Sequence, residues 1–323
     1  MEDTDINDAC IHELESFVGT KASLQQVPQR LAHYTTISNL EKIMAAEEFW
    51  FSNPLFMNDL QELRLGLNQG MQLIAGDSMV EEACKTPERA QELRRKLQHY
   101  FSKFDENHAL DVYVFCLSAH DVEDNDGILS MWRAYGGQGN GAALVFDTSF
   151  LTFQQNSPLV IAKVNYKSDI ERLEELRAII HKYMAIIVEM NIPTDRLYII
   201  AFQLFELFKT FALSYKHTGF REENEWRIIL FSERDRDDVF KGCYHYHIGP
   251  RGVEPKLKFK IKPLAIPNSH QTWTFHKILD RIILGPSVSS PLARASIIRM
   301  LQAVGKPDFA EKVVASTIPL RPG

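Results

Sequence analysis

Hydrophobic residues follow two different spacings along this chain, and these spacings predict where strands and helices lie. Short runs rich in β-branched and aromatic residues are typical of strands. The first half of the chain predicts strands at LAHYTT (31–36), EFWFS (48–52), DVYVFCLS (111–118), AALVFD (142–147) and LVIAKVNY (159–166). The C-terminal third adds EWRIILF (225–231), CYHYHI (243–248), KLKFKIK (256–262) and DRIILG (280–285).

Apolar residues at helical spacing predict the elements between these strands. A first helix covers residues 5–18, and Ser38 and Glu41 form an S-x-x-E capping box that opens a helix toward Ala46. Further helices are expected at roughly 58–75 and 79–104, at 168–213 as two helices broken at 191–193, and near 290–303.

The order of these elements does not repeat a βαβ unit, so a purely parallel sheet is not expected. We predict an α+β fold with a mixed, largely antiparallel β core. Residues 1–323 are predicted to form a single domain. It has an N-terminal helix at about 1–26, a β core from about 27, helical insertions at about 58–104 and 168–213, and C-terminal strands and a helix at about 222–323.

Composition narrows the class of protein. The chain has 323 residues, of which 45% are hydrophobic and 24% charged, enough for a full core. No uninterrupted apolar run reaches membrane-span length, and the acidic N-terminus is unlike a secretion leader, so a cytoplasmic protein without a membrane partner is expected. Four scattered cysteines predict neither a zinc site nor disulfides. A net charge of −6 argues against a surface built throughout for nucleic acid.

The segment LSMWRAYGGQGNGAALVFD, residues 129–147, predicts a short helix, a glycine-rich turn and a buried strand. Trp132 and Tyr135 lie three residues apart on that helix and are therefore neighbours. Aromatic residues beside a glycine turn suggest a wall that holds a flat ligand, although such a pair is also typical of a core. The glycine run precedes a strand and does not join a strand to a helix, so it is not a dinucleotide-binding fingerprint.

Two sets of polar residues are candidates for chemistry. His33 lies at the end of a short strand, where a histidine can bind a sugar hydroxyl or serve a structural role. Glu223, Glu225 and Arg227 alternate with Asn224 and apolar residues, so strand periodicity places the charged trio on one face. If Arg227 pairs with one glutamate, the other is free for a substrate. A solvated or ion-paired sheet face would give the same pattern.

The strand KLKFKIK places Lys256, Lys258, Lys260 and Lys262 on one face. Such lysines protect an edge strand from aggregation or bind phosphates. His245 and His247 also share a face, but no third ligand at a recognisable spacing supports a metal site.

Several of these blocks, in this order, resemble the bacterial domain of unknown function numbered 2971. They are LAHYTT, FWFSNPLFMND with Glu62 shortly after, FCLS, MWRAYGG with GAALVFD, ENEWRIIL and ILDRIILG, spread from about residue 31 to residue 286. The glycine at position 136 departs from the more polar residue that the family resemblance leads us to expect.

A histidine on the first strand, a central aromatic and a glutamate on a late strand also resemble the ADP-ribosyltransferase fold. That resemblance implies that His33 positions NAD. It assigns Tyr135 to stack on nicotinamide, with Trp132 or Tyr34 as substitutes. It implies that Glu225 stabilises the transition state, supported by Ser52, and that Glu223 orients the acceptor.

The expected function is therefore that of an NAD-dependent ADP-ribosyltransferase-like enzyme, a toxin or phage-defence effector that modifies a macromolecule. NAD is its substrate, the acceptor is a protein or a nucleic acid, and no metal is expected. Two alternatives stay open. One is a metal-dependent nuclease with Asp59, Glu62, Asp147 and Glu225 around magnesium. The other is a non-catalytic nucleotide-sensing or interaction module.

Overall fold

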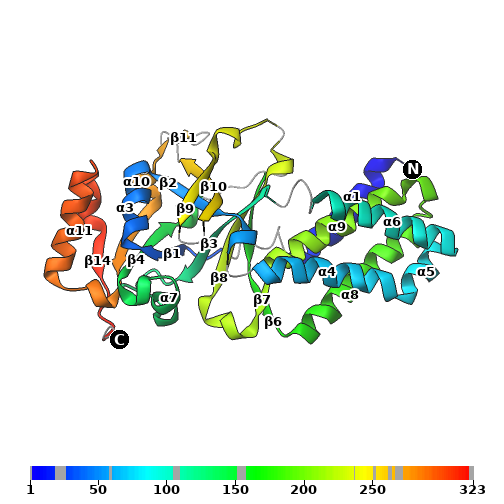
Figure 1. Cartoon of the computed structure of the whole chain (residues 1–323), viewed down its shortest axis with the longest axis horizontal. Coiled ribbons are helices and arrows are strands. Elements are labelled where there is room, and N and C mark those ends of the chain that lie inside the picture. Colours follow the sequence, from blue (N-terminus) through cyan, green and yellow to red (C-terminus); the bar gives the residue numbers. More distant parts are fainter. Residues whose placement is uncertain are drawn as a thin grey trace. The chain divides into compact units, whose positions relative to one another are not determined.

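Residues of this chain group into two compact units in the computed structural model (Figure 1). The structure describes residues 2–18, 27–57, 60–104, 110–150, 158–235, 237–249, 252–260, 264–265 and 272–319. Unit 1 comprises Met1–Gln25, Asn53–Val112 and Ile161–Arg221, and unit 2 comprises Gln26–Ser52, Tyr113–Val160 and Glu222–Gly323. The N-terminal helix and the two helical insertions that the sequence predicts fall in unit 1. The prediction that the chain folds as a single domain stays a prediction.

Unit 1 is built from helices around one apolar helix, α9 (Leu197–Ser214). Nearly every residue of α9 is buried, as expected for a helix that is hydrophobic on all sides. The helices that contact it are α1 (Asp3–Val18), α4 (Leu60–Gly76), α6 (Pro87–Lys103) and α8 (Asp169–Glu189). A short helix, α5 (Ser78–Cys84), and the parallel pair β6 (Asn165–Lys167) and β7 (Tyr215–His217) complete the unit.

The segment Thr194–Ser214 is the one stretch of the described residues long and apolar enough to cross a membrane. It is buried as the core helix of a fold is, because 89% of its apolar stretch lies inside the protein. Its polar side chains also find partners there: Gln203 Nε2 donates to Asn7 Oδ1 at 3.0 Å. The Lys209 ammonium lies 2.8 Å from Glu206 Oε1.

Two helix boundaries differ from those expected from the sequence. The predicted helix at 79–104 is two helices, because Lys85 adopts a left-handed conformation (φ 65°) and Thr86 caps α6 ahead of Pro87. The capping box predicted at Ser38 is also wrong. The N-cap of helix α3 (Ile37–Ala46) lies two residues earlier: Thr36 caps the helix by accepting a hydrogen bond from Asn39 N at 3.3 Å.

Unit 2 is built on a ten-stranded sheet with the order β14-β13-β4-β1-β3-β2-β10-β9, to which β8 is joined through β3, and β5 through β8. Only the β13–β14 pair is parallel among the strand pairs whose register is known in this sheet. The predicted α+β class with a mixed, largely antiparallel core is therefore confirmed. The strands are β1 (Arg30–Thr36), β2 (Glu48–Ser52), β3 (Val112–His120), β4 (Gly141–Asp147), β5 (Leu159–Lys163), β8 (Glu225–Phe231), β9 (Tyr244–Gly249), β10 (Gly252–Lys260), β13 (Leu279–Leu284) and β14 (Val313–Ala315).

Alternation along β1 supplies two separate apolar layers, one on each face of the sheet. Tyr34 belongs to a buried cluster that includes Trp132 of α7 (Leu129–Ala134), together with Ala32, Met131, Ala143, Val145 and Ile283. His33 points to the opposite face, where phenylalanines gather around Phe49, with ring centroids 5.2 Å from Phe115 and 5.0 Å from Phe146. The short helix α10 (Phe275–Ile278) adds a ring to this second layer, and α11 (Pro291–Ala303) and the strands β11 (Leu264–Ala265) and β12 (Thr272–Trp273) lie elsewhere in the unit.

Candidate functional site

His33 lies where β1 separates from β3. The paired register runs from Arg30 opposite His120 to Ala32 opposite Ser118 and then stops. At the next position the His33 side chain, and not the backbone, contacts β3. Its Nδ1 lies 2.9 Å from the Cys116 carbonyl oxygen, and the ring stacks on Phe115 with centroids 4.5 Å apart. The imidazole therefore occupies the fork that opens between the two strands.

The protonation state of His33 follows from this position. Burial lowers its pKa below the usual value of 6.5, and the hydrogen bond to the Cys116 carbonyl opposes that effect only in part, so the ring is neutral at pH 7. A carbonyl oxygen only accepts hydrogen bonds, so Nδ1 carries the proton. Nε2 is then a lone-pair acceptor, which suits a hydroxyl donor such as one on a ribose.

Tyr34 and Trp132 are buried in the core cluster, and their polar atoms are used there. Ile128 N donates to the Tyr34 hydroxyl at 2.8 Å, and Trp132 Nε1 donates to the Asp126 carbonyl oxygen at 2.8 Å. The two rings meet edge to face with centroids 4.8 Å apart. Burial raises the pKa of Tyr34 to about 12. Both aromatics therefore pack the sheet, and their role as substitutes for Tyr135 in ligand stacking stays a prediction.

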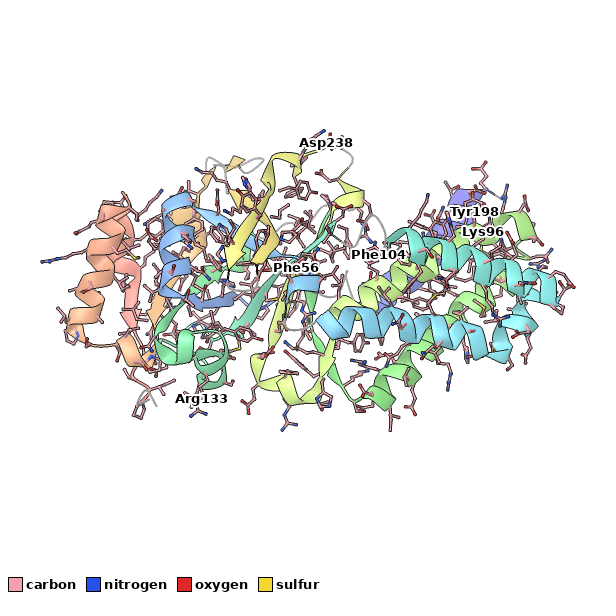
Figure 2. All side chains as sticks on the ribbon, in the orientation of Figure 1. Phe56, Lys96, Phe104, Arg133, Tyr198 and Asp238 are labelled. Atoms are coloured by element: carbon pink, nitrogen blue, oxygen red, sulfur yellow. The ribbon has the colours of Figure 1, made fainter. Side chains whose placement is uncertain are left out.

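The glycine run serves this packing. A Cβ added to Gly136 would lie 2.6 Å from Trp132 Cε3, and one added to Gly141 would collide with the Thr35 carbonyl oxygen. Most of the predicted aromatic and glycine wall therefore faces the core. Neighbouring Arg133, in contrast, lies at the outer surface of α7 (Figure 2).

Tyr135 is the aromatic residue of this segment that reaches solvent, with 37% of its surface exposed. Its hydroxyl donates to Glu223 Oε1 at 3.0 Å, and Glu223 is buried. The predicted charged trio on one strand face is wrong in one respect. Glu223 ends a 3-10 segment, Asn224 has a positive φ of 42°, and β8 begins only at Glu225. The backbone break turns Glu223 toward Tyr135.

Glu225 and Arg227 lie on the same face of β8 as the alternation predicts, and both are buried. Arg227 holds the carboxylate with two donors: Nε lies 2.8 Å from Oε1, and one terminal nitrogen lies 3.1 Å from Oε2. This forked contact fixes the plane of the carboxylate. The arginine therefore pairs with Glu225, and Glu223 pairs with Tyr135.

Ser52 makes its described side-chain contact with β10. Its hydroxyl accepts a hydrogen bond from Lys256 Nζ at 2.8 Å, and the same ammonium lies 3.4 Å from Glu254 Oε2. The support for Glu225 that the resemblance implies for Ser52 stays a prediction.

Strand β3 connects the candidate residues. Its Cys116 carbonyl holds His33, and three residues along, Ala119 N donates to the Asn224 carbonyl oxygen at 2.9 Å. Asn224 stands between Glu223, bound to Tyr135, and Glu225. The structure thus links His33, Tyr135 and the two glutamates through one strand. No sequence signal marked Cys116, whose contribution is a backbone carbonyl.

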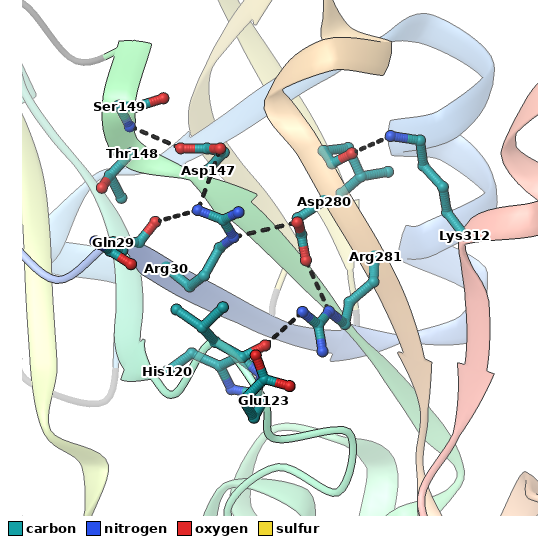
Figure 3. Close-up of polar contacts among 12 residues, drawn as sticks. Gln29, Arg30, His120, Glu123, Asp147, Thr148, Ser149, Asp280, Arg281 and Lys312 are labelled. Atoms are coloured by element: carbon teal, nitrogen blue, oxygen red, sulfur yellow. Dashed lines mark hydrogen bonds and ion pairs between the residues drawn. The ribbon is translucent and has the colours of Figure 1, made fainter.

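The nuclease alternative requires several carboxylates around one metal ion. Among the described residues, no group of three or more histidine, cysteine, aspartate or glutamate side chains is placed to hold an ion. Asp59 lies outside the described residues, and the side chain of Glu62 is likewise not described. Asp147 lies 3.1 Å from Arg30, whose guanidinium also meets Asp280 at 3.2 Å (Figure 3). The four cysteines are free.

Fold and contacts define an α+β protein in which strand β3 contacts a neutral histidine, His33, and also Asn224, which stands between two buried glutamates, one of them bound to Tyr135. Residues 131–228 match the model of a family described as protein of unknown function (DUF2971). The matched segment contains Tyr135, Glu223 and Glu225, and it supports the resemblance to that family. No curated protein and no solved structure matches the chain, so the resemblance to the ADP-ribosyltransferase fold gains no support from these comparisons.

Proposed function

We propose that unit 2 carries an NAD-dependent ADP-ribosyltransferase-like site around His33, Tyr135, Glu223 and Glu225. The observation that carries the proposal is the hydrogen bond from the Tyr135 hydroxyl to Glu223, at 3.0 Å. It brings a solvent-reaching aromatic ring to the start of β8, directly before Glu225. Strand β3 connects that point to His33.

The reaction requires few groups from the protein. The N-glycosidic bond between the ribose C1′ and nicotinamide breaks, and its electron pair leaves with nicotinamide. A nucleophile of the acceptor forms a bond to C1′ and loses its proton to solvent. Positive charge develops on the ribose as the first bond breaks, and a fixed carboxylate beside it lowers the barrier.

Each residue has a separate role in this proposal. His33 accepts a hydrogen bond from a ribose hydroxyl at its Nε2, and the Tyr135 ring stacks on nicotinamide. Glu225, oriented by Arg227, faces the charge that develops on the ribose. Glu223, held by Tyr135, orients the acceptor, which is a protein or a nucleic acid.

The test is incubation of the protein with adenylate-labelled NAD and a cell lysate, with label on macromolecules and free nicotinamide both measured. Glu225→Gln is expected to lower both by about 100-fold or more, because it removes the negative charge at the transition state. Glu222→Gln is the matched control, since Glu222 is an exposed glutamate three positions away. Product formation by folded Glu225→Gln protein at the rate of the unaltered protein would contradict the assigned mechanism.

One contact favours a second candidate function, a non-catalytic nucleotide-sensing module. Both oxygens of Glu225 are engaged by Arg227, so the carboxylate is already used inside the protein. Such a module would be stabilised thermally by NAD and would release no nicotinamide. The same NAD incubation separates the two functions.

A further inference from the structure

One face of strands β2, β10 and β9 gathers positive and aromatic side chains that the proposed function does not use. We call it the lysine face and define it as Trp50, His245, His247, Lys256, Lys258 and Lys260. The strand register places Lys258 opposite Trp50 and Lys256 opposite His245. The alternation of β10 therefore puts its three lysines on the same side as the indole.

Contacts on this face show how the aromatic ring is presented. The Lys258 ammonium lies 4.3 Å from the centroid of Trp50, and the His247 ring lies 6.2 Å from it at an angle of 50°. Trp50 Nε1 donates to Glu48 Oε2 at 3.1 Å, which fixes the orientation of the indole. Trp50 is partly exposed, whereas Trp132 and Trp226 are buried.

Two carboxylates, Glu48 and Glu254, lie on the same side as the three lysines of β10, so this face keeps a net positive charge. Glu48 is bound to the indole nitrogen, and Glu254 is buried beside Lys256 at 3.4 Å. Lys258 lies over the ring, and Lys260, which is opposite Glu48 in the register, is exposed. An oriented aromatic ring with adjacent ammonium groups is the arrangement that binds bases by stacking and phosphates by charge.

We propose that the lysine face binds single-stranded nucleic acid. Alternate residues on a strand are about 6.6 Å apart, so successive lysines can follow the backbone of an extended strand. A base takes the place of the Lys258 ammonium over Trp50, and the ammonium moves to a neighbouring phosphate. A duplex is not the ligand, because its stacked bases cannot reach a ring on a sheet surface. This inference does not rest on the proposed NAD chemistry.

The test measures binding of the full chain to fluorescein-labelled single strands of RNA and of DNA, of about 12 nucleotides, by fluorescence anisotropy and without NAD. Trp50→Leu is expected to weaken binding about tenfold, and Trp50→Phe to retain most of it because a stacking surface remains. In the Lys258→Ala/Lys260→Ala protein, the slope of log affinity against log salt is expected to fall by about 1.4, or about 0.7 for each lost phosphate contact.

Lys277→Ala is the matched control, because Lys277 is an exposed lysine on α10, away from this face. The comparison of RNA with DNA shows which nucleic acid is preferred, and either preference supports the proposal. Absence of binding by the unaltered protein at low salt would overturn it. So would equal affinity for a duplex, or affinities of Trp50→Leu and the double lysine variant equal to that of Lys277→Ala. The lysine changes are at the surface, so their result does not depend on a repacked core.

Discussion

Each unit contains a buried ion pair, and the two pairs differ in what surrounds them. In unit 1, Glu206 and Lys209 meet at 2.8 Å one turn apart on α9. The Lys209 ammonium also lies 5.5 Å and 5.9 Å from the ring centroids of Phe205 and Phe104. This pair lies among apolar and aromatic groups inside a helical core.

In unit 2, Glu225 and Arg227 meet through two contacts on a strand. Their neighbour along the chain, Glu223, is bound to Tyr135, which reaches solvent. Glu225 therefore lies two positions from a residue whose partner, Tyr135, reaches solvent. Burial and distance are alike in the two cases, so neither property alone would mark a functional pair; what separates the pair in unit 2 is the contact between Tyr135 and Glu223 beside it.

The largest expected effect is on unit 1. Glu206→Ala removes a carboxylate partner of a buried ammonium and should lower the free energy of unfolding by about 3–5 kcal/mol, measured by urea denaturation. Replacing both partners, with Glu206→Leu and Lys209→Met, should recover most of that loss because neither charge of the pair is then left buried without its partner. NAD turnover by the folded fraction should not change, and a proportionate loss of turnover would refute the structural role.

Arg227→Met tests the pair in unit 2 and should have a similar or slightly smaller effect on stability, about 3 kcal/mol, because the Glu225 carboxylate loses its forked partner. Unlike the change at Glu206, it should also abolish both nicotinamide release and thermal stabilisation by NAD. Arg227→Lys should recover stability in part, since it keeps the charge and loses the fork. Unchanged NAD-dependent stabilisation in Arg227→Met would separate this pair from the site.

Most elements could be predicted from the sequence because their signals are local. The strand EFWFS is found at Glu48–Ser52, and the helical break at 191–193 separates α8 from α9. The grouping of helices into unit 1 depends on contacts between distant segments, which no local pattern records. The start of α3 differs from the predicted one because Thr36 and Ser38 are both suited to cap a helix, and Thr36 is the residue that does so.

The sequence alone indicates which residues belong to the candidate site, but it predicts only some of the contacts between them. Alternation correctly placed Glu225 with Arg227, because strand periodicity is a local property. The bond between Tyr135 and Glu223 depends on the positive φ of Asn224, which the strand pattern did not reveal. The burial of Trp132 depends on the backbone that approaches it at Gly136.

Gly136→Ala tests whether that position must be a glycine for Trp132 to pack in the core. The added Cβ would lie 2.6 Å from Trp132, so overpacking should cost about 1–3 kcal/mol of unfolding free energy. Gly242→Ala is the control in the same unit, because a Cβ there meets no atom within 4 Å and stability should stay within about 0.5 kcal/mol. Equal stability of the two variants in thermal denaturation would show that the backbone around Trp132 yields easily.

The smallest expected effect is a pH dependence that arises from His33. Burial lowers its pKa in the folded protein, so the unfolded chain binds a proton first as the pH falls. The stability that this neutral ring contributes is complete above about pH 6.5 and is lost progressively as the pH falls below that value. His33→Gln cannot titrate and should flatten this part of the stability profile, measured by urea denaturation from about pH 7.5 to 5. His120, whose pKa burial also lowers, should account for a remaining slope. A profile of His33→Gln parallel to that of the unaltered protein would mean that His33 has the same pKa in the folded and the unfolded chain, and it would contradict the lowering of that pKa by burial.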